Sequence, residues 1–285
     1  MMLQAGLVAV VMIAFAGNSV LNRIGVAHFH MDPVTFGALR VGAGALILLA
    51  LTGTAGWPVL RSRRRWMGAM TLATYMIGFS WAYQSLGAGL GALILFATVQ
   101  IVMFGTAVRR GLAVPALRWA GMAVAMVGLV VLLWPAGVVR VDPGGALTMI
   151  AAGIGWGVYT LLGQAEHDAS GATAANFTLC LPLMLVAVTL RADLGPLPAQ
   201  GVGVALVAGA VTSGLGYALW YRVLPALPVT IAAIAQLSVP VIAVLAGIVL
   251  LSEPLTLRIA AAAVLVLGGI GLSVLRQRRI GSNGS

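Results

Sequence analysis

YQSLGAGLGALIL (residues 83–95) is followed half a chain later by the similar YRVLPALPVTIAA (residues 221–233). Each begins with tyrosine and a polar residue, reaches leucine at its fourth position, and passes through small residues or proline into an apolar run. Aligned at the tyrosine, the two stretches stay in register for 13 residues at an offset of 138. What this repetition means depends on the solvent in which the chain folds.

The composition indicates that this solvent is lipid. The chain has 285 residues, of which 61% are hydrophobic and 8% charged, and its mean hydropathy is +1.07. Soluble domains carry about 25% charged residues and could not hide so much apolar surface. The formal charge of +10 does not indicate nucleic-acid binding, because the arginines lie between apolar runs rather than on one basic face. The sequence therefore predicts an integral membrane protein whose surroundings are the lipid bilayer.

The apolar pattern predicts ten membrane-spanning helices, because a bilayer span needs about 20 apolar residues. Strand alternation is absent, so we expect an all-α bundle and not a barrel. The predicted spans are 4–27, 33–53, 66–86, 91–108, 115–134, 144–165, 172–190, 199–221, 228–250 and 256–275.

The basic residues predict the orientation of these spans. All 16 are arginine, which is typical of a GC-rich bacterial genome, and we expect a bacterial inner (cytoplasmic) membrane. Short cytoplasmic loops carry an excess of positive charge. With both termini in the cytoplasm, 11 arginines lie inside and 4 outside. The inside set is Arg61, Arg63, Arg64, Arg65, Arg109, Arg110, Arg118, Arg222, Arg276, Arg278 and Arg279, and the outside set is Arg23, Arg140, Arg191 and Arg258.

The repetition can now be interpreted as an inverted repeat. Further matches occur at an offset of 140, including AGNSVL from residue 16 with WGVYTL from residue 156, and Arg118 with Arg258. We expect a first half over 1–140 and a second over 141–280, with 281–285 (GSNGS) as an appended tail outside the fold. Five spans in each half make the second half run upside down around a central cavity. Such halves can exchange conformations and expose one site to each side in turn, which favours a transporter.

At this point the sequence resembles the drug/metabolite transporter superfamily in its ten-span, EamA-type form. The resemblance rests on PVTFGALR (residues 33–40), WGVYTLLGQ (156–164) and the long stretch YRVLPALPVTIAAIAQLSVPVIAVLAGIVLLSEPLT (221–256). It implies a carrier that exports amino acids or related metabolites, and a ten-span exporter of aromatic amino acids is one member. This chain has Val102 where the repeat would place Pro240, so a proline hinge is expected in the second half alone. Pro240 and Gly163 are our candidate hinge or gate residues.

Arg40 is the most informative candidate for the substrate cavity. It lies about 10 Å inside the second span, where a charge is costly and usually faces a cavity or a partner. Its guanidinium could bind a substrate carboxylate bidentately, or it could instead reach outward to the interface. Asn18 and Asn22 share one face of the first span, where they either line the cavity or join helices.

The aromatic candidates follow helical spacing. Trp156 lies at the middle of its span, away from the interface where Trp usually lies, so we interpret it as a cavity wall. Trp220 and Tyr221, near a span end, are expected to anchor at that interface instead. Other aromatic or amide side chains within the spans are either cavity lining or core. They are Tyr75, Phe79, Tyr83, Gln100, Tyr159, Tyr217 and Gln236.

Three functions compete. We favour a carrier that exports small amphipathic metabolites, most simply amino acids with aromatic ones preferred, and that works as a monomer without cofactor or metal. A multidrug exporter of organic cations is the alternative, although such export ordinarily uses an acid inside the membrane. An intramembrane enzyme would need a catalytic set that the sequence lacks. Every acid and histidine falls at a span end or in a loop, so we expect a facilitator and not proton-driven transport.

Overall fold

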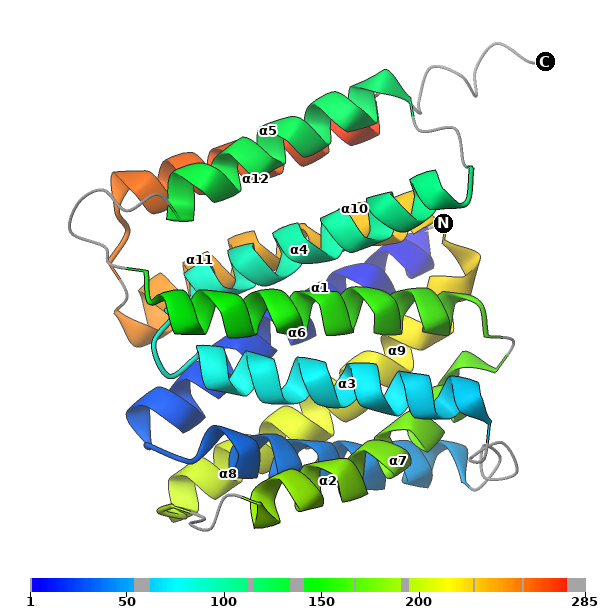
Figure 1. Cartoon of the computed structure of the whole chain (residues 1–285), viewed down its shortest axis with the longest axis vertical. Helices are drawn as coiled ribbons and strands as arrows, with labels where there is room; N and C mark the ends of the chain where they lie inside the picture. The colour runs from blue at the N-terminus through cyan, green and yellow to red at the C-terminus, as the bar shows by residue number, and fades with distance from the viewer. Residues whose placement is uncertain are drawn as a thin grey trace.

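The computed structural model describes residues 2–53, 62–111, 115–133, 141–166, 168–190, 195–227, 229–252 and 254–275, and every regular element among them is helical (Figure 1). Two short segments are π-helical (η1 and η3) and one is a 3₁₀ turn (η4). In chain order the elements are α1 (Met2–Arg23), η1 (Ile24–His28), α2 (Pro33–Thr52), α3 (Arg63–Ala82), α4 (Ala88–Arg109), α5 (Ala116–Leu133), α6 (Pro143–Gln164), α7 (Ala169–Thr189), α8 (Ala199–Val207), η3 (Ala208–Leu215), α9 (Gly216–Val223), η4 (Leu224–Ala226), α10 (Val229–Gln236), α11 (Ser238–Leu251) and α12 (Leu257–Leu275).

Each of the ten predicted spans coincides with one helix or with a chain of consecutive helices, which confirms the all-α prediction. Six of these segments are long and apolar enough to cross a membrane, and three more are shorter apolar helices. The remaining one, α3, has 20 residues but begins with three arginines that lower its hydropathy. The predicted tail 281–285 lies outside the described residues.

Acidic side chains lie at the helix ends. Asp32, Asp142 and Asp168 each accept a hydrogen bond from the backbone N–H three residues on, and so cap α2, α6 and α7. The bonds from the Gly145 N–H and the Ser85 hydroxyl lower the pKa of Asp142. Glu166 pairs with Arg64 and Arg65 just after α6. The other two acids, Asp193 and Glu253, lie outside the described residues.

The helices pack in a regular scheme. Helix α6 packs on α3 and α4, whereas α1 packs on η3, α9 and α11, and α2 packs on α7, α8 and η3. Helix α1 starts at the end of the bundle where α6 finishes, so these two helices run in opposite directions (Figure 1). The chain reverses direction between successive predicted spans, and the described ends, residues 2 and 275, lie at the same end of the bundle (Figure 1).

Helices α5 and α12 form a pair of their own at one side of the bundle (Figure 1). Glycine makes this pairing close: a Cβ on Gly269 would lie 2.3 Å from the carbonyl oxygen of Gly121. Small residues of this kind let helix backbones approach each other in membranes. The pair packs against the remaining helices mainly through α4, so it has a looser contact with the bundle.

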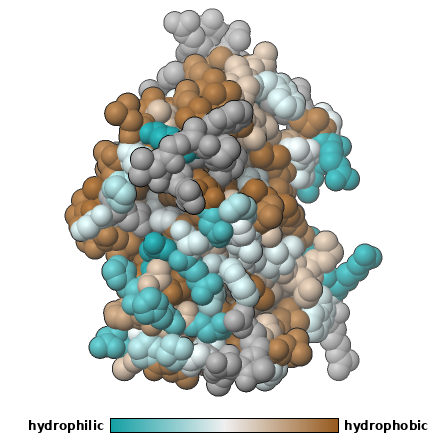
Figure 2. All heavy atoms as spheres, turned by 60° about the vertical axis from the view of Figure 1, so that its left-hand side comes forward, coloured by the Kyte–Doolittle hydropathy of each residue, from teal (hydrophilic) through white to brown (hydrophobic). Residues whose placement is uncertain are grey.

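The flanks of the bundle expose large hydrophobic side chains, including Leu46, Val249, Leu250, Leu257 and Val264. Figure 2 shows hydrophobic side chains over much of the surface, with polar ones gathered toward the lower part of the face turned forward. Exposing so large an apolar surface to water is unfavourable in free energy, whereas the acyl chains of a bilayer solvate it. This surface supports the membrane location that the composition predicts.

Candidate functional site

A small central cavity of about 10 Å³ lies between α1, α3, α4, α6 and α9. Its wall is mostly aromatic, and the Ser19 hydroxyl adds a polar group from α1. The lining residues are Phe15, Ser19, Tyr75, Phe79, Leu95, Phe96, Trp156 and Tyr217. This volume has room for about one water molecule, whereas ligand pockets usually have about 300–1,000 Å³, so the central cavity is closed to a substrate in this conformation.

Arg40 lies directly behind this wall and is completely buried. Its Nε donates to the Ser213 hydroxyl at 2.8 Å, and its Nη2 donates to the hydroxyls of Tyr75 at 3.1 Å and Tyr217 at 3.5 Å. The guanidinium carbon also lies 5.3 Å from the ring centre of Phe79. Its Nη1 has no hydrogen-bond partner. The membrane core therefore holds a cation that is bonded to neutral oxygens and keeps one donor group unused.

The partners of Arg40 come from an unusual part of the chain. Ser213 lies in η3, and π-helical turns are rare and frequent at functional sites. Close approach of α2 to this turn depends on Gly209, because a Cβ there would lie 2.4 Å from the Arg40 carbonyl oxygen. The geometry around the guanidinium thus depends on a glycine that the sequence pattern did not single out.

Trp156 is the centre of the aromatic cluster. Its ring centre lies 4.9 Å from Tyr217, 5.1 Å from Tyr75 and 5.3 Å from Phe15. The indole N–H donates to the Gln236 side-chain oxygen at 2.7 Å, so this indole is fixed by a residue of α10. The ring contact with Phe15 bridges α6 to α1. Aromatic residues of four predicted spans and the amide of a fifth are therefore brought together here.

Asn18 and Asn22 join helices. Asn18 donates to the Thr212 carbonyl at 3.2 Å, and its side-chain oxygen accepts from the hydroxyls of Thr212 and Ser213. Asn22 accepts from the Ser80 hydroxyl at 2.8 Å. In this conformation Ser19, rather than either amide, contributes the α1 polar group to the cavity wall.

Tyr159 and Tyr221 close the cavity toward the end of the bundle where α6 finishes. Their ring centres are 5.4 Å apart, and the Tyr221 hydroxyl donates to the Tyr159 carbonyl at 3.4 Å. The Tyr221 ring lies against Gly163, where any Cβ would overlap it. The expectation that Trp220 and Tyr221 anchor at the interface is wrong. Both are completely buried because α9 turns this face toward α1, α6 and α7.

Tyr83 and a larger hollow lie toward the opposite end. The Tyr83 hydroxyl donates to the Ala88 carbonyl at 3.2 Å, and Arg23 donates to the Tyr83 carbonyl at 2.9 Å. A hollow of about 210 Å³ opens beside them between the ends of α1, α4, α11 and α12. Along α4, its lining residue Leu90 precedes the cavity residue Leu95 by five positions, or roughly 7.5 Å.

The ninth predicted span is interrupted near Pro240. Helix α10 ends at Gln236 and α11 begins at Ser238, so the break at Leu237 comes three residues before the proline. Proline has no N–H to bond the carbonyl four residues back, here that of Gln236. Gln100 approaches this segment from α4 and donates to the Ala233 carbonyl at 2.8 Å, outside the central cavity.

Four wall residues were missing from the sequence-based candidates. Phe15 and Ser19 are four apart on α1 and so share a face beside the one that carries Asn18. That spacing could have indicated them. Leu95 and Phe96 lie within a continuous apolar run, where spacing cannot separate a cavity wall from core.

Comparison with known proteins identifies the family. The sequence profile of the EamA-like transporter family matches residues 143–275, the second predicted half. The uncharacterized protein PA1977 of Pseudomonas aeruginosa is 43% identical over 268 residues, which cover 93% of this chain and 92% of that protein. The chain belongs to the EamA-like transporter family.

One further relative and one solved structure are similar to this chain. The uncharacterized transporter YwfM of Bacillus subtilis is 25% identical over 237 residues, covering 79% of this chain and 78% of that one. A crystal structure of a protein 21% identical in sequence superimposes with a TM-score of 0.69, covering 96% of this chain and 99% of that chain. At that identity the likeness concerns the fold alone. Members of the family are transporters and not enzymes, so the chain is a multi-pass membrane transporter of a small molecule.

Proposed function

We propose that this transporter exports amino acids or closely related carboxylates, with aromatic side chains preferred, by alternating access. The observation that carries the proposal is the completely buried Arg40 with its unused Nη1, next to an aromatic cavity. A guanidinium matches a carboxylate in geometry and charge. The rings of Trp156, Tyr75 and Phe79 offer stacking surfaces to an aromatic side chain. When the wall opens, the substrate carboxylate takes the unused N–H groups of Arg40.

Arg40 also distinguishes this proposal from an organic-cation exporter. Each acid that the structure describes lies at a helix end, so none of them neutralises the guanidinium. A second cation in the cavity would be repelled by an unscreened charge in a low-dielectric environment. A carboxylate instead supplies the missing countercharge.

We further propose that the two halves form an inverted repeat. The helix packing supports this, because exchanging the halves maps its main contacts onto one another. The packing of α6 on α3 and α4 in one arrangement corresponds to the packing of α1 on α9 and α11 in the other. The pairs α2–α7 and α5–α12 each contain one helix from each half, so the exchange swaps the two members of each pair and leaves the contact in place. The opposite directions of α1 and α6 have the same implication (Figure 1). Two such halves rocking about a central cavity would give alternating access.

Purified protein in liposomes, given a panel of radiolabelled amino acids and organic cations, tests the proposed substrate class. We expect saturable flux of one or more aromatic amino acids and none of the cations above that of empty liposomes. Flux of cations without flux of any amino acid would establish the alternative instead.

The topology gives a prediction of its own: both termini and the RSRRR loop (residues 61–65) are cytoplasmic. Cysteine introduced at Ser62 should resist an impermeant maleimide in intact cells, whereas cysteine at Asp193 should react. The native Cys180 is completely buried and gives little background. Labelling of position 62 from outside would reverse the assignment.

The coupling mechanism is a second prediction. The cavity wall contains no titratable acid or histidine, and arginine stays protonated at any accessible pH. We therefore expect a facilitator that only equilibrates its substrate. With equal substrate on both sides of a liposome membrane, an imposed pH difference should cause no net movement. Uphill accumulation that a protonophore abolishes would refute this expectation.

A further inference from the structure

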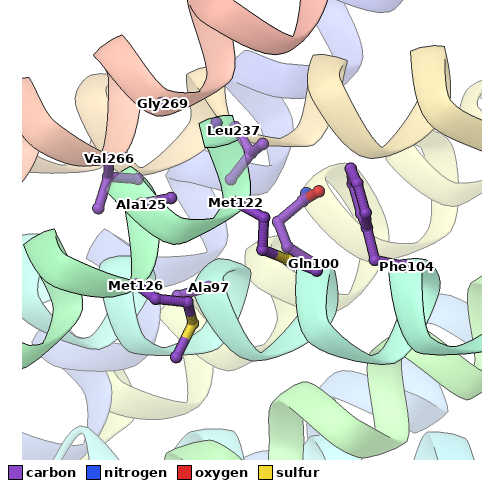
Figure 3. Close-up of a pocket in the computed structure, with 10 residues that line it drawn as sticks. Ala97, Gln100, Phe104, Met122, Ala125, Met126, Leu237, Val266 and Gly269 are labelled. Carbon is purple, nitrogen blue, oxygen red and sulfur yellow. The ribbon is translucent and has the colours of Figure 1, made fainter. Parts of the chain in front are cut away.

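A second pocket lies away from the central cavity, between α4, the α10–α11 break and the α5–α12 pair (Figure 3). We call this pocket the side groove. It is narrow, with a volume of about 20 Å³, and is almost entirely apolar. Figure 3 shows its lining side chains converging from α4, α5, α12 and the segment around Leu237. They are Ala97, Gln100, Phe104, Gly121, Met122, Ala125, Met126, Leu237, Val266 and Gly269.

The side groove lies at the depth of the acyl chains. Gln100 is 12 residues from the start of α4 and 9 from its end, or roughly 18 Å and 14 Å along the axis. The single amide in the wall is engaged, because Gln100 bonds the Ala233 carbonyl. Neighbouring side chains on α5, such as Val127 and Val130, are exposed and face lipid. In the groove wall itself, Met122 and Met126 are half-buried, so the groove reaches the lipid-facing surface at these two side chains. Its chemistry and depth suit a hydrocarbon chain that enters by displacing the flexible methionine side chains.

Three arginines lie beyond one end of the side groove. Arg109 and Arg110 follow the lining residue Phe104 by five and six positions, and Arg118 precedes the lining residue Met122 by four. Since α4 runs toward this end and α5 runs back from it, all three arginines come to the same end, within one to two helical turns of the groove. Arg109 and Arg110 are exposed and Arg118 is half-buried. The ion pairs seen in the described part of the chain join Arg64 and Arg65 to Glu166, so these three carry uncompensated charge.

We propose that the side groove binds an anionic phospholipid. One acyl chain lies among Phe104, Met122 and Met126, and the phosphate and headgroup lie against Arg109, Arg110 and Arg118. Basic pockets between membrane helices on the cytoplasmic side are suited to such headgroups. Methionine adapts to an irregular chain, which suits a ligand whose conformation varies. In the proposed topology, the lipid belongs to the inner leaflet.

This lipid would lie against the break between α10 and α11. Leu237 contributes to the groove wall and also marks the break between α10 and α11. The preceding residue, Gln236, accepts the hydrogen bond from Trp156 in the central cluster. The proposed lipid site and the proposed substrate cavity therefore both contact residues at this helix break.

The headgroup contacts are tested with the purified full chain by native mass spectrometry, titrating phosphatidylglycerol and phosphatidylcholine of the same acyl chains. We expect phosphatidylglycerol to bind roughly ten- to thirtyfold more tightly. The double variant Arg109→Gln with Arg118→Gln should lose most of that preference. The control is Arg63→Gln with Arg222→Gln, which removes the same charge from exposed positions elsewhere at the same end. Equal binding of both lipids by the wild type, or the same loss in the control, would overturn the proposal.

The groove itself is tested separately with Met122→Trp, whose larger side chain fills part of it. We expect weaker binding of both phospholipids, with the preference for phosphatidylglycerol retained because the arginines remain. The melting temperature in detergent checks that the variant is folded. Undiminished binding of both lipids to folded Met122→Trp would show that no acyl chain enters the side groove.

Discussion

Arg40→Gln is expected to lower the affinity of the transporter for amino acids by about ten- to hundredfold. Hydrogen bonds to a charged group contribute about 1.5–3 kcal/mol each, and each 1.4 kcal/mol is about tenfold in affinity. Glutamine keeps a donor near Ser213 but loses the charge and the unused Nη1. Substrate titrations of flux in liposomes measure the effect as a higher KM.

Arg40→Lys separates charge from geometry. It keeps the positive charge but cannot reach Ser213, Tyr75 and Tyr217 together with a substrate, because an ammonium lacks the planar fork. We expect it to recover part of the affinity lost in Arg40→Gln. If both folded variants transported amino acids with the wild-type KM, Arg40 would have a structural role only.

Trp156→Ala is expected to have the second largest effect, a loss of about tenfold in transport of aromatic amino acids with a much smaller loss for small aliphatic ones. Ring contacts contribute about 0.5–1.5 kcal/mol beyond buried area, and only an aromatic substrate loses such a contact here. Competition between labelled phenylalanine and labelled alanine in the same liposomes measures the ratio directly.

The matched control for this variant is Trp220→Ala. Trp220 is as deeply buried and also touches Phe15, but it does not line the cavity. Its loss should destabilise the protein comparably without changing the ratio of the two substrates. An equal loss of both substrates in Trp156→Ala would mean that Trp156 serves packing alone.

The helices could be predicted from the sequence because each bilayer crossing imposes a long apolar run with recognisable ends. Pro33 and Pro143 open helices behind Asp caps, and both boundaries came within a residue of those observed. The π-helical turn at Ser213 was not predictable, since its residues are ordinary small side chains in an apolar run. Its position depends on packing of Gly209 against α2, which is a tertiary effect.

The candidate site was partly predictable for a related reason. Arg40 and Trp156 stood out because their chemistry is costly or unusual at mid-membrane depth, and the structure joins them through Tyr75 and Tyr217. Gln100 and Gln236 were both candidates within apolar spans, yet Gln100 lies beside the side groove while Gln236 bonds Trp156. Helical spacing gives the face of one helix but not which neighbour that face meets, so it could not separate these two amides.

Counterflow of phenylalanine and of its carboxamide, measured with the wild-type protein in the same liposome preparation, tests carboxylate recognition most directly. The two compounds share the aromatic ring and the amino group and differ in whether a carboxylate is present for Arg40. Liposomes preloaded with unlabelled phenylalanine should take up labelled phenylalanine at least tenfold faster than the labelled amide. Uptake of the amide at an equal or greater rate would contradict the proposed role of Arg40 and favour a carrier of cations.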